Sequence, residues 1–270
     1  MINKKIYITG GIGARHEEES FGKNYELPNL TAYNETCAAI GSVYWNHRLF
    51  NLTGNTNYFD VIERTLYNGL ISGLSLDGTN FFYPNALESD GKYKFNKGAC
   101  TRKGWFDCSC CPTNLIRFLP SIPQLLYSRN ENDLFVNMYV SNETEVKINN
   151  HKIKLSQKSN MPWDGNVHFE VFLSDKANFV MKLRIPYWAR NEVMNGNLYQ
   201  FVNKADLPIT VKINGEIINP IIKENYIVLD RGWKSKDRVD IKFSMKVRTC
   251  LLYTSPSPRD RTRSRMPSSA

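Results

Sequence analysis

Four of the six cysteines of this chain lie within twelve residues, in the run Cys100-(x7)-Cys108-Ser109-Cys110-Cys111. Adjacent cysteines form a disulfide only with strain, because the bridge needs a wider Cα separation than the about 3.8 Å that one trans peptide allows. Zinc is a more natural partner for closely spaced thiolates. The spacing therefore indicates a metal or thiol-chemistry site, with small buried cysteines in a reducing cytosol as the alternative.

Further suitable ligands lie upstream, in Glu35-Thr36-Cys37. Zinc accepts carboxylate oxygen as well as thiolate sulfur in a tetrahedral shell of four ligands. Glu35, Cys37, Cys110 and Cys111 together would complete such a shell. This is not the pattern of a zinc ribbon, which pairs two CxxC motifs, so the spacing alone leaves both interpretations open.

Helical periodicity predicts the elements that position these groups. Apolar residues at helical spacing run from Tyr33 to Leu52, which places Glu35 and Cys37 in a first turn, where the helix dipole favours anions. A second helix is expected from about Tyr58 to Leu74, with Glu63 inside it.

A third helix is expected over residues 112–126, beginning at a proline, a residue favoured in the first turn. It places Cys110 and Cys111 at a helix N-terminus, where exposed backbone N–H groups lower a thiol pKa and favour a reactive or metal-bound thiolate. Pro120 and Pro123 should kink or split this helix.

Beyond residue 127 the hydrophobic period changes from 3.6 to 2, which is typical of strands. Asn214-Gly215 is a strong signal for a two-residue hairpin turn. Seven or so short strands in about 120 residues are typical of a β-sandwich. We therefore predict a helical domain at 1–128 and a β-sandwich at 129–249, with strands near 134–140, 145–148, 167–173, 179–185, 209–213, 226–229 and 238–245.

The segment 250–270 has no apolar periodicity and carries four arginines among its prolines and serines. Its composition is that of a basic disordered tail. It resembles translated sequencing-adapter read-through more closely, so we expect it to be non-native and assign it neither fold nor function.

The formal charge of +9 suggests a nucleic-acid partner, but its distribution argues against one. Residues 1–128 hold 12 basic and 11 acidic side chains, and the basic excess lies in strand-like sequence without an arginine stripe. No run of 18 apolar residues occurs, and the start is too short and polar for a signal peptide. We expect a cytoplasmic protein without nucleic-acid or membrane partners, unless the true start is missing.

Seven short motifs follow one another along the chain. They are Tyr7–Gly13, Tyr33–Cys37, Glu63–Gly69, Phe81–Tyr83, Cys108–Pro112, Met161–Gly165 and Leu183–Ala189. In this order they resemble glycoside hydrolase family 127, the β-L-arabinofuranosidases, and the resemblance covers about residues 1–249.

The resemblance implies a retaining glycosidase that uses a cysteine nucleophile. By position, Cys110 looks like the nucleophile and Glu19, in the acidic loop Glu17–Glu19, looks like the general acid/base. The residues that look like zinc ligands are Glu35, Cys37, Cys110 and Cys111, and those that match sugar-contacting positions are Glu63 and Tyr83. Without the resemblance, Glu19 would be one of three interchangeable loop acids, Glu63 a surface or ion-paired residue, and Tyr83 a core aromatic.

The family's catalytic domain is an (α/α)6 barrel of twelve helices, and this chain offers three helices before its strands. We therefore expect the C-terminal part of such a barrel followed by a β-sandwich, in a fragment truncated at both ends with little or no turnover. The expected activity is release of β-L-arabinofuranose from plant-type glycans or glycoproteins. The alternative is a non-catalytic, zinc-stabilised carbohydrate-binding or structural module, and the oligomeric state stays open.

Overall fold

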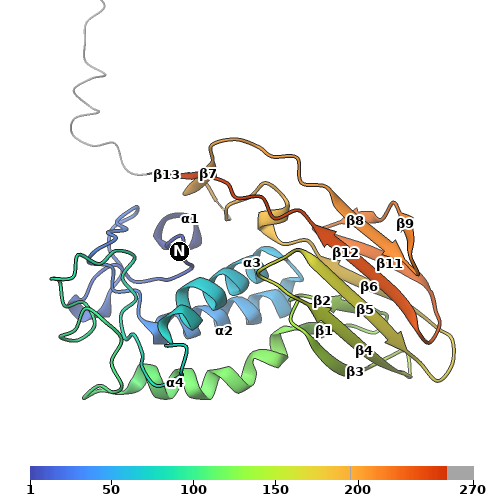
Figure 1. The fold of residues 1–270 in the computed structure, drawn as a ribbon, viewed down its shortest axis with the longest axis horizontal. Coiled ribbons are helices and arrows are strands. Elements are labelled where there is room, and N and C mark those ends of the chain that lie inside the picture. Colours follow the sequence, from blue (N-terminus) through green and yellow to red (C-terminus); the bar gives the residue numbers. More distant parts are fainter. Residues whose placement is uncertain (195, 254–270) are drawn as a thin grey trace, which may run out of the picture.

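The computed structural model describes residues 1–194 and 196–253. Helices gather in a helical part, residues 1–126, and two large sheets form a strand part, residues 127–253, beside it (Figure 1). The helical part contains α1 (Ile2–Lys5), η1 (Glu17–Glu19), α2 (Thr36–Thr53), α3 (Asn57–Arg64), η2 (Thr65–Leu70), η3 (Ile71–Gly73), α4 (Cys110–Phe118) and η4 (Leu119–Leu125).

Local sequence explains where these helices end. Gly54 follows α2 with a φ of 68° and donates its N–H to the carbonyl of Phe50, a left-handed cap that glycine adopts without strain. The second expected helix is observed as a continuous run, but its centre, η2, is a π-helix. At the end of α4, Pro120 and Pro123 lie in the 3₁₀ segment η4, which confirms the expected break.

The strand part holds a five-stranded and a six-stranded sheet. The first has the order β1 (Tyr127–Arg129), β2 (Asp133–Val136), β6 (Ala177–Arg184), β11 (Tyr226–Trp233), β10 (Ile221–Lys223), and only its β2–β6 pair is parallel among the described pairs. The second has the order β3 (Asn142–Ile148), β4 (His151–Ser159), β5 (Asn166–Phe172), β12 (Asp237–Phe243), β8 (Ile209–Ile213), β9 (Glu216–Ile218).

One hydrophobic core fills the space between these two sheets. Leu134 and Met181 of the first sheet belong to the same buried cluster as Phe169 and Val239 of the second. A separate core joins α2, α3 and α4 in the helical part, where the rings of Phe50 and Phe59 meet edge to face at 4.5 Å. The chain is thus a mixed α and β structure with a core in each part.

Several strands are additional to the sequence expectation. β4 is the longest of these, and its buried Ile153 and Leu155 alternate with exposed lysines. A two-stranded sheet pairs β7 (Tyr199–Phe201) with β13 (Cys250–Leu252). The expectation that 250–270 stays outside the fold is therefore wrong for β13, because its backbone has a strand partner, whereas residues 254–270 lie outside the described residues.

A buried network of charges joins the two parts. Arg184 on β6, which is fully buried, pairs through Nη1 with Asp60 Oδ1 of α3 at 2.6 Å and through Nη2 with Glu63. Arg190 pairs with the second Asp60 oxygen, also at 2.6 Å. The neighbouring Arg64 donates through Nη2 to the carbonyl of Val193 in the strand part. These contacts fix α3 against the strand part.

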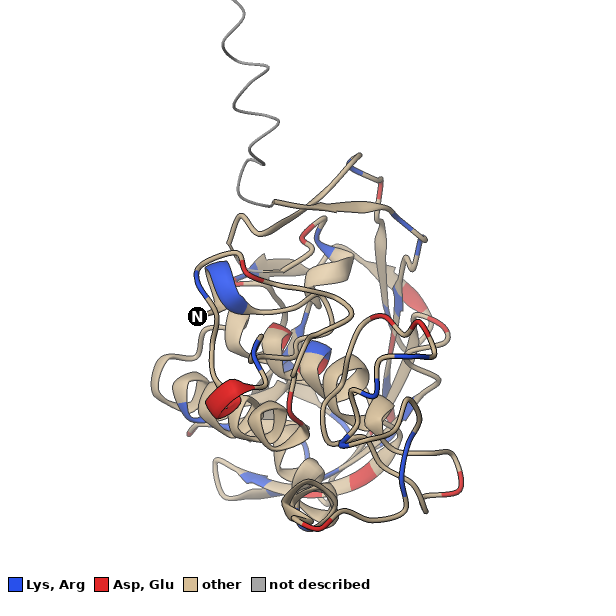
Figure 2. Cartoon of the chain, turned by 90° about the vertical axis from the view of Figure 1, so that its left-hand side faces the viewer, with Lys and Arg blue, Asp and Glu red and all other residues tan. Residues whose placement is uncertain are grey.

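Basic and acidic residues are interspersed over the side of the chain shown in Figure 2. None of the helices within residues 1–194 and 196–253 combines the length and apolar character needed to cross a bilayer. The expectations of a cytoplasmic location and of no nucleic-acid partner stay predictions.

Candidate functional site

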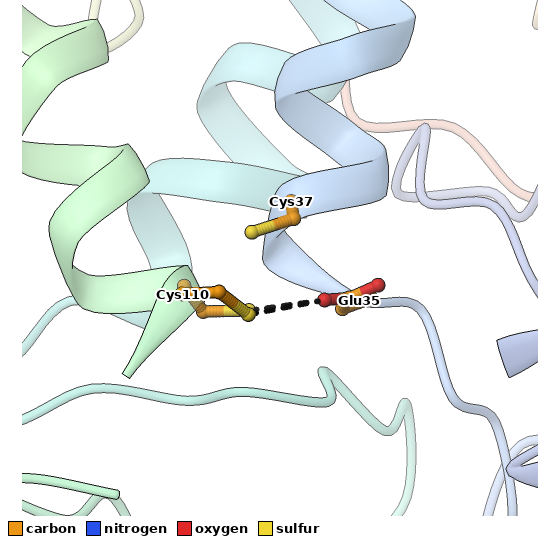
Figure 3. A group of neighbouring side chains, drawn as sticks. Glu35, Cys37 and Cys110 are labelled. Carbon is orange, nitrogen blue, oxygen red and sulfur yellow. Dashed lines mark hydrogen bonds between the residues drawn. The ribbon is translucent and has the colours of Figure 1, made fainter. Parts of the chain in front are cut away.

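Two helix starts and one extended segment bring the candidate ligands together. α2 begins directly after Glu35, and α4 begins at Cys110, two residues earlier than expected from the sequence. The extended segment 81–84 runs beside α2, with an isolated bridge between Glu35 and Pro84. Figure 3 shows that the side chains of Glu35, Cys37 and Cys110 converge between α2 and α4.

The candidate ligand atoms are spaced for a single metal ion. Oε1 of Glu35 lies 3.4 Å from Sγ of Cys111 and 3.7 Å from Sγ of Cys110, and the two sulfurs are 3.9 Å apart. With Cys37 included, all four ligand atoms lie within 4.8 Å of one another. Tetrahedral zinc, with bonds of about 2.3 Å to sulfur and about 2.0 Å to oxygen, separates its ligand atoms by about 3.5–3.8 Å. The donor types and their spacing therefore fit a metal ion of this kind.

Burial and mutual hydrogen bonding give the three thiols different acidities. The hydrogen bond from Cys111 lowers the pKa of Cys37 to about 7, and the same contact, together with burial, raises the pKa of Cys111. Burial raises the pKa of Cys110 to about 11, and its hydrogen bond with Tyr83 acts in the opposite direction. A bound divalent cation would oppose the two upward shifts, because coordinated thiols deprotonate.

Tyr83 lies against the expected nucleophile. Its side chain is 4% exposed, and its hydroxyl lies 2.9 Å from Sγ of Cys110. Its ring meets Phe106 edge to face at 5.6 Å. Tyr83 is therefore both a core aromatic and a neighbour of the cysteine site, and its contact with sugar stays a prediction.

A hydrogen bond from the buried Tyr33 distinguishes Glu19 from the other two acids of its loop. The Tyr33 hydroxyl donates to Glu19 Oε1 at 2.6 Å. Lys97 Nζ lies 3.1 Å from the same hydroxyl and 4.4 Å from the ring centroid of Tyr83. Continuous contacts thus connect the carboxylate of Glu19 with Tyr83 and, through it, with Cys110. The proposed role of Glu19 as general acid/base stays a prediction.

Sequence reasoning missed Tyr33 and Lys97. Tyr33 opens the motif that contains Glu35 and Cys37, so its position in that motif was an available signal. Lys97 lies in an irregular loop with a φ of 48°, and no spacing pattern marks it. The remaining nearby thiols lie outside the ligand set. Cys100 donates a hydrogen bond to the carbonyl of Tyr93 at 3.5 Å, and Cys108 is exposed.

Glu63 lies apart from the cysteine site, in the ion-pair network between the two parts. Arg184 binds one of its oxygens, and the Trp188 indole N–H donates to the other at 2.9 Å. Gly73 lies ten residues after Glu63 in the same helical run and is near Thr36 at the start of α2. Ten residues of helix span on the order of 15 Å, so Glu63 lies at the end of this run that is far from the cysteine site. The ion-paired alternative for Glu63 is thus observed, whereas its contact with sugar stays a prediction.

Comparison with known proteins connects this site to a family. Residues 1–124 match the model of the β-L-arabinofuranosidase GH127 catalytic domain, and residues 133–245 match that of the GH127 middle domain. A non-reducing end β-L-arabinofuranosidase of Bifidobacterium longum subsp. longum is 36% identical over 199 residues, which cover 70% of this chain and 30% of that protein.

Two solved structures have the same fold over almost the whole chain. A GH127 β-arabinofuranosidase is 47% identical, with a TM-score of 0.87 over 96% of this chain and 39% of its own. A GH127 β-L-arabinofuranosidase from Geobacillus stearothermophilus T6 is 36% identical, with a TM-score of 0.82 over 97% of this chain and 39% of its own. The chain thus spans less than half the length of these relatives. Its two domain matches confirm the resemblance read from the sequence, and the chain belongs to glycoside hydrolase family 127, the β-L-arabinofuranosidase family.

Proposed function

We propose that this chain is the part of a retaining glycoside hydrolase that carries its nucleophile, its acid/base and its metal ligands, and that the hydrolase releases β-L-arabinofuranose from plant-type glycans or glycoproteins. The convergence of Glu35, Cys37, Cys110 and Cys111 carries the proposal. The names of the family and of its relatives support the sugar.

We also propose the architecture expected for this family: the C-terminal part of an (α/α)6 barrel over residues 1–128 and a β-sandwich over 129–249. The separate matches to a catalytic and a middle domain support this division. The core shared by the two large sheets supports the sandwich.

In the proposed reaction, Cys110 and Glu19 act on opposite sides of the scissile bond. The sulfur of Cys110 attacks the anomeric carbon, while Glu19 gives its proton to the leaving oxygen and the carbon–oxygen bond breaks. Glu19 then takes a proton from water, the water oxygen bonds to the anomeric carbon, and the carbon–sulfur bond breaks. The configuration at the anomeric carbon is retained because it is inverted twice.

The surrounding side chains prepare these two groups. Zinc bound to the four ligands would supply charge that keeps the cysteines as thiolates at neutral pH. Tyr83 holds the sulfur of Cys110 with its hydroxyl, and Tyr33 holds the carboxylate of Glu19. Both tyrosines are almost fully buried, so each of these hydrogen bonds comes from a side chain that is packed in place.

The first half of this reaction is tested with an activated donor, β-L-arabinofuranosyl fluoride, and intact-mass measurement of the chain. Fluoride leaves without strong acid assistance, so the test isolates attack by sulfur. We expect an adduct of one anhydropentose on the peptide containing Cys110. The C110S variant should lack it, and E19Q should accumulate it, because removal of the sugar needs the base.

Modification that persists in C110S, or no adduct in the metal-loaded wild-type chain, would contradict the proposed nucleophile. A non-catalytic carbohydrate-binding or structural module would form no adduct in any variant. Turnover of natural glycans by residues 1–270 is expected to be small and is a separate question from this single covalent step.

A further inference from the structure

A cavity of about 550 Å³ opens where the helical part meets the strand part. Glu63, Tyr67 and Asn68, from α3 and η2, form one of its walls, and Trp163 and Trp188, from the strand part, contribute two indole rings. None of the described residues that line it belongs to the cysteine site. Its size lies within the usual range for small-molecule sites.

The two indole rings are held in different ways. Trp188 is fixed by its hydrogen bond to Glu63 and by an edge-to-face contact with Phe243 at 5.8 Å. Trp163 is 83% exposed, and its backbone N–H donates to the carbonyl of Asn160 at 2.8 Å. An open aromatic face at the rim of a cavity is suited to stacking on a flat apolar surface of a ligand.

The lining residues from α3 and η2 offer hydrogen-bond acceptors. The carboxylate of Glu63 receives one bond from Arg184 and one from Trp188, and a carboxylate has about four acceptor positions. Asn68 donates its amide N–H to the carbonyl of Arg64 at 3.1 Å. Within residues 1–194 and 196–253, neither the Tyr67 hydroxyl nor Oδ1 of Asn68 has a hydrogen-bond partner.

The charge of the cavity selects a neutral ligand. Among the described residues that line it, Glu63 alone carries a charge, and Arg184 compensates that charge from behind. The cavity therefore suits a molecule with several hydroxyl donors and an apolar C–H face. An apolar peptide segment would cover the indoles but leave the acceptors without donors, which is costly in a buried contact.

We propose that this cavity is a second carbohydrate-binding site, which stacks a neutral sugar unit on Trp163 and accepts hydrogen bonds from its hydroxyls at Tyr67, Asn68 and Glu63. It rests on the proposed function only for the choice of an arabinose-containing ligand. The site would hold a glycan chain at the junction of the two parts, independently of bond cleavage at Cys110.

The test is a titration of residues 1–270 with linear arabinotriose. Binding is measured by intrinsic tryptophan fluorescence and by saturation-transfer NMR. We expect saturable binding that W163A weakens about tenfold or more, since stacking is lost, and that Y67F weakens by a smaller factor. The matched control is W105A, because Trp105 is also exposed (57%) but lies outside the cavity.

The C110S variant separates this site from the catalytic proposal. Binding that is unchanged in C110S and reduced in W163A supports the second site even if no covalent adduct ever forms at Cys110. Absence of saturable binding, equal affinity of W163A and wild type, or loss of binding in C110S would each overturn the proposal.

Discussion

Replacing Arg184 tests how strongly the junction between the two parts depends on buried charge. In wild type its guanidinium is fully buried between Asp60 and Glu63, and its Nε also donates to the carbonyl of Asn137 at 2.7 Å. Methionine at this position (R184M) keeps much of the volume but removes the charge. Asp60, whose side chain is 2% exposed, would then keep Arg190 as its cation.

The expected loss follows from the burial of the remaining carboxylates. Breaking a buried ion pair by removing one partner destabilises a protein by about 3–5 kcal/mol, because the remaining charge is neither solvated nor fully paired. We therefore expect R184M to lower the free energy of unfolding by about 3–5 kcal/mol. The matched control R238M removes an exposed arginine that lies 3.8 Å from Glu170 and should change it by less than about 1 kcal/mol.

The pH dependence adds a second criterion. Burial already raises the pKa of Asp60 despite both arginines. A carboxyl whose folded pKa is raised destabilises the fold fully above that pKa, and this penalty disappears as the pH falls through it toward the unfolded value near 3.8. The deficit of R184M should therefore shrink as the pH is lowered.

Urea unfolding of wild type, R184M and R238M, followed by tryptophan fluorescence at several pH values from 8 down to about 5, measures both effects. A deficit for R184M no larger than that for R238M would refute the reasoning. So would a deficit that grows as the pH falls, because protonation of Asp60 should relieve it.

Two further predictions concern the backbone and the surface. A Cβ at Gly165 would lie 2.1 Å from the Phe243 carbonyl oxygen, so G165A should lower the free energy of unfolding by about 1–3 kcal/mol. G41A, in open space on α2, should raise it by about 0.5–1 kcal/mol. Thermal unfolding measures both variants, and a G165A variant more stable than G41A would contradict this prediction. The Arg15 side chain lowers the pKa of Glu26 to about 2, so this pair stabilises the fold above about pH 4.5 and the effect is lost as the pH falls toward 2. R15A should show a smaller loss of stability than wild type between pH 6 and pH 3, and equal losses would show that the pair does not contribute.

The sequence predicted the cysteine site better than the elements that carry it. Glu35, Cys37, Cys110 and Cys111 could be grouped because zinc ligands have recognisable types and the family motifs contain them. The sequence predicts the start of α4 at Pro112, two residues after its observed start at Cys110. Proline is compatible with the whole first turn, where N–H groups have no intrahelical acceptor, so its presence does not fix which residue comes first.

Other features depend on contacts distant in sequence. Glu63 forms its ion pair with Arg184, which lies 121 residues away in the sequence. No local sequence pattern predicts that partner. β4 was missed because Lys152 and Lys154 dominate its composition, although its other face is buried against the core. Lys97 reaches Tyr33 and Tyr83 only because its loop folds over them.

The metal content of the purified chain tests the central claim most directly. Residues 1–270 would be prepared under reducing conditions without chelator, together with C111S and C108S, and measured by elemental analysis. The proposed site predicts about one zinc ion per chain in wild type and in C108S, whose changed residue lies outside the ligand set, and a large loss in C111S, since zinc binds through four ligands. A metal-free wild-type chain, or equal metal content in C111S and C108S, would contradict the assignment of Glu35, Cys37, Cys110 and Cys111 as a metal site.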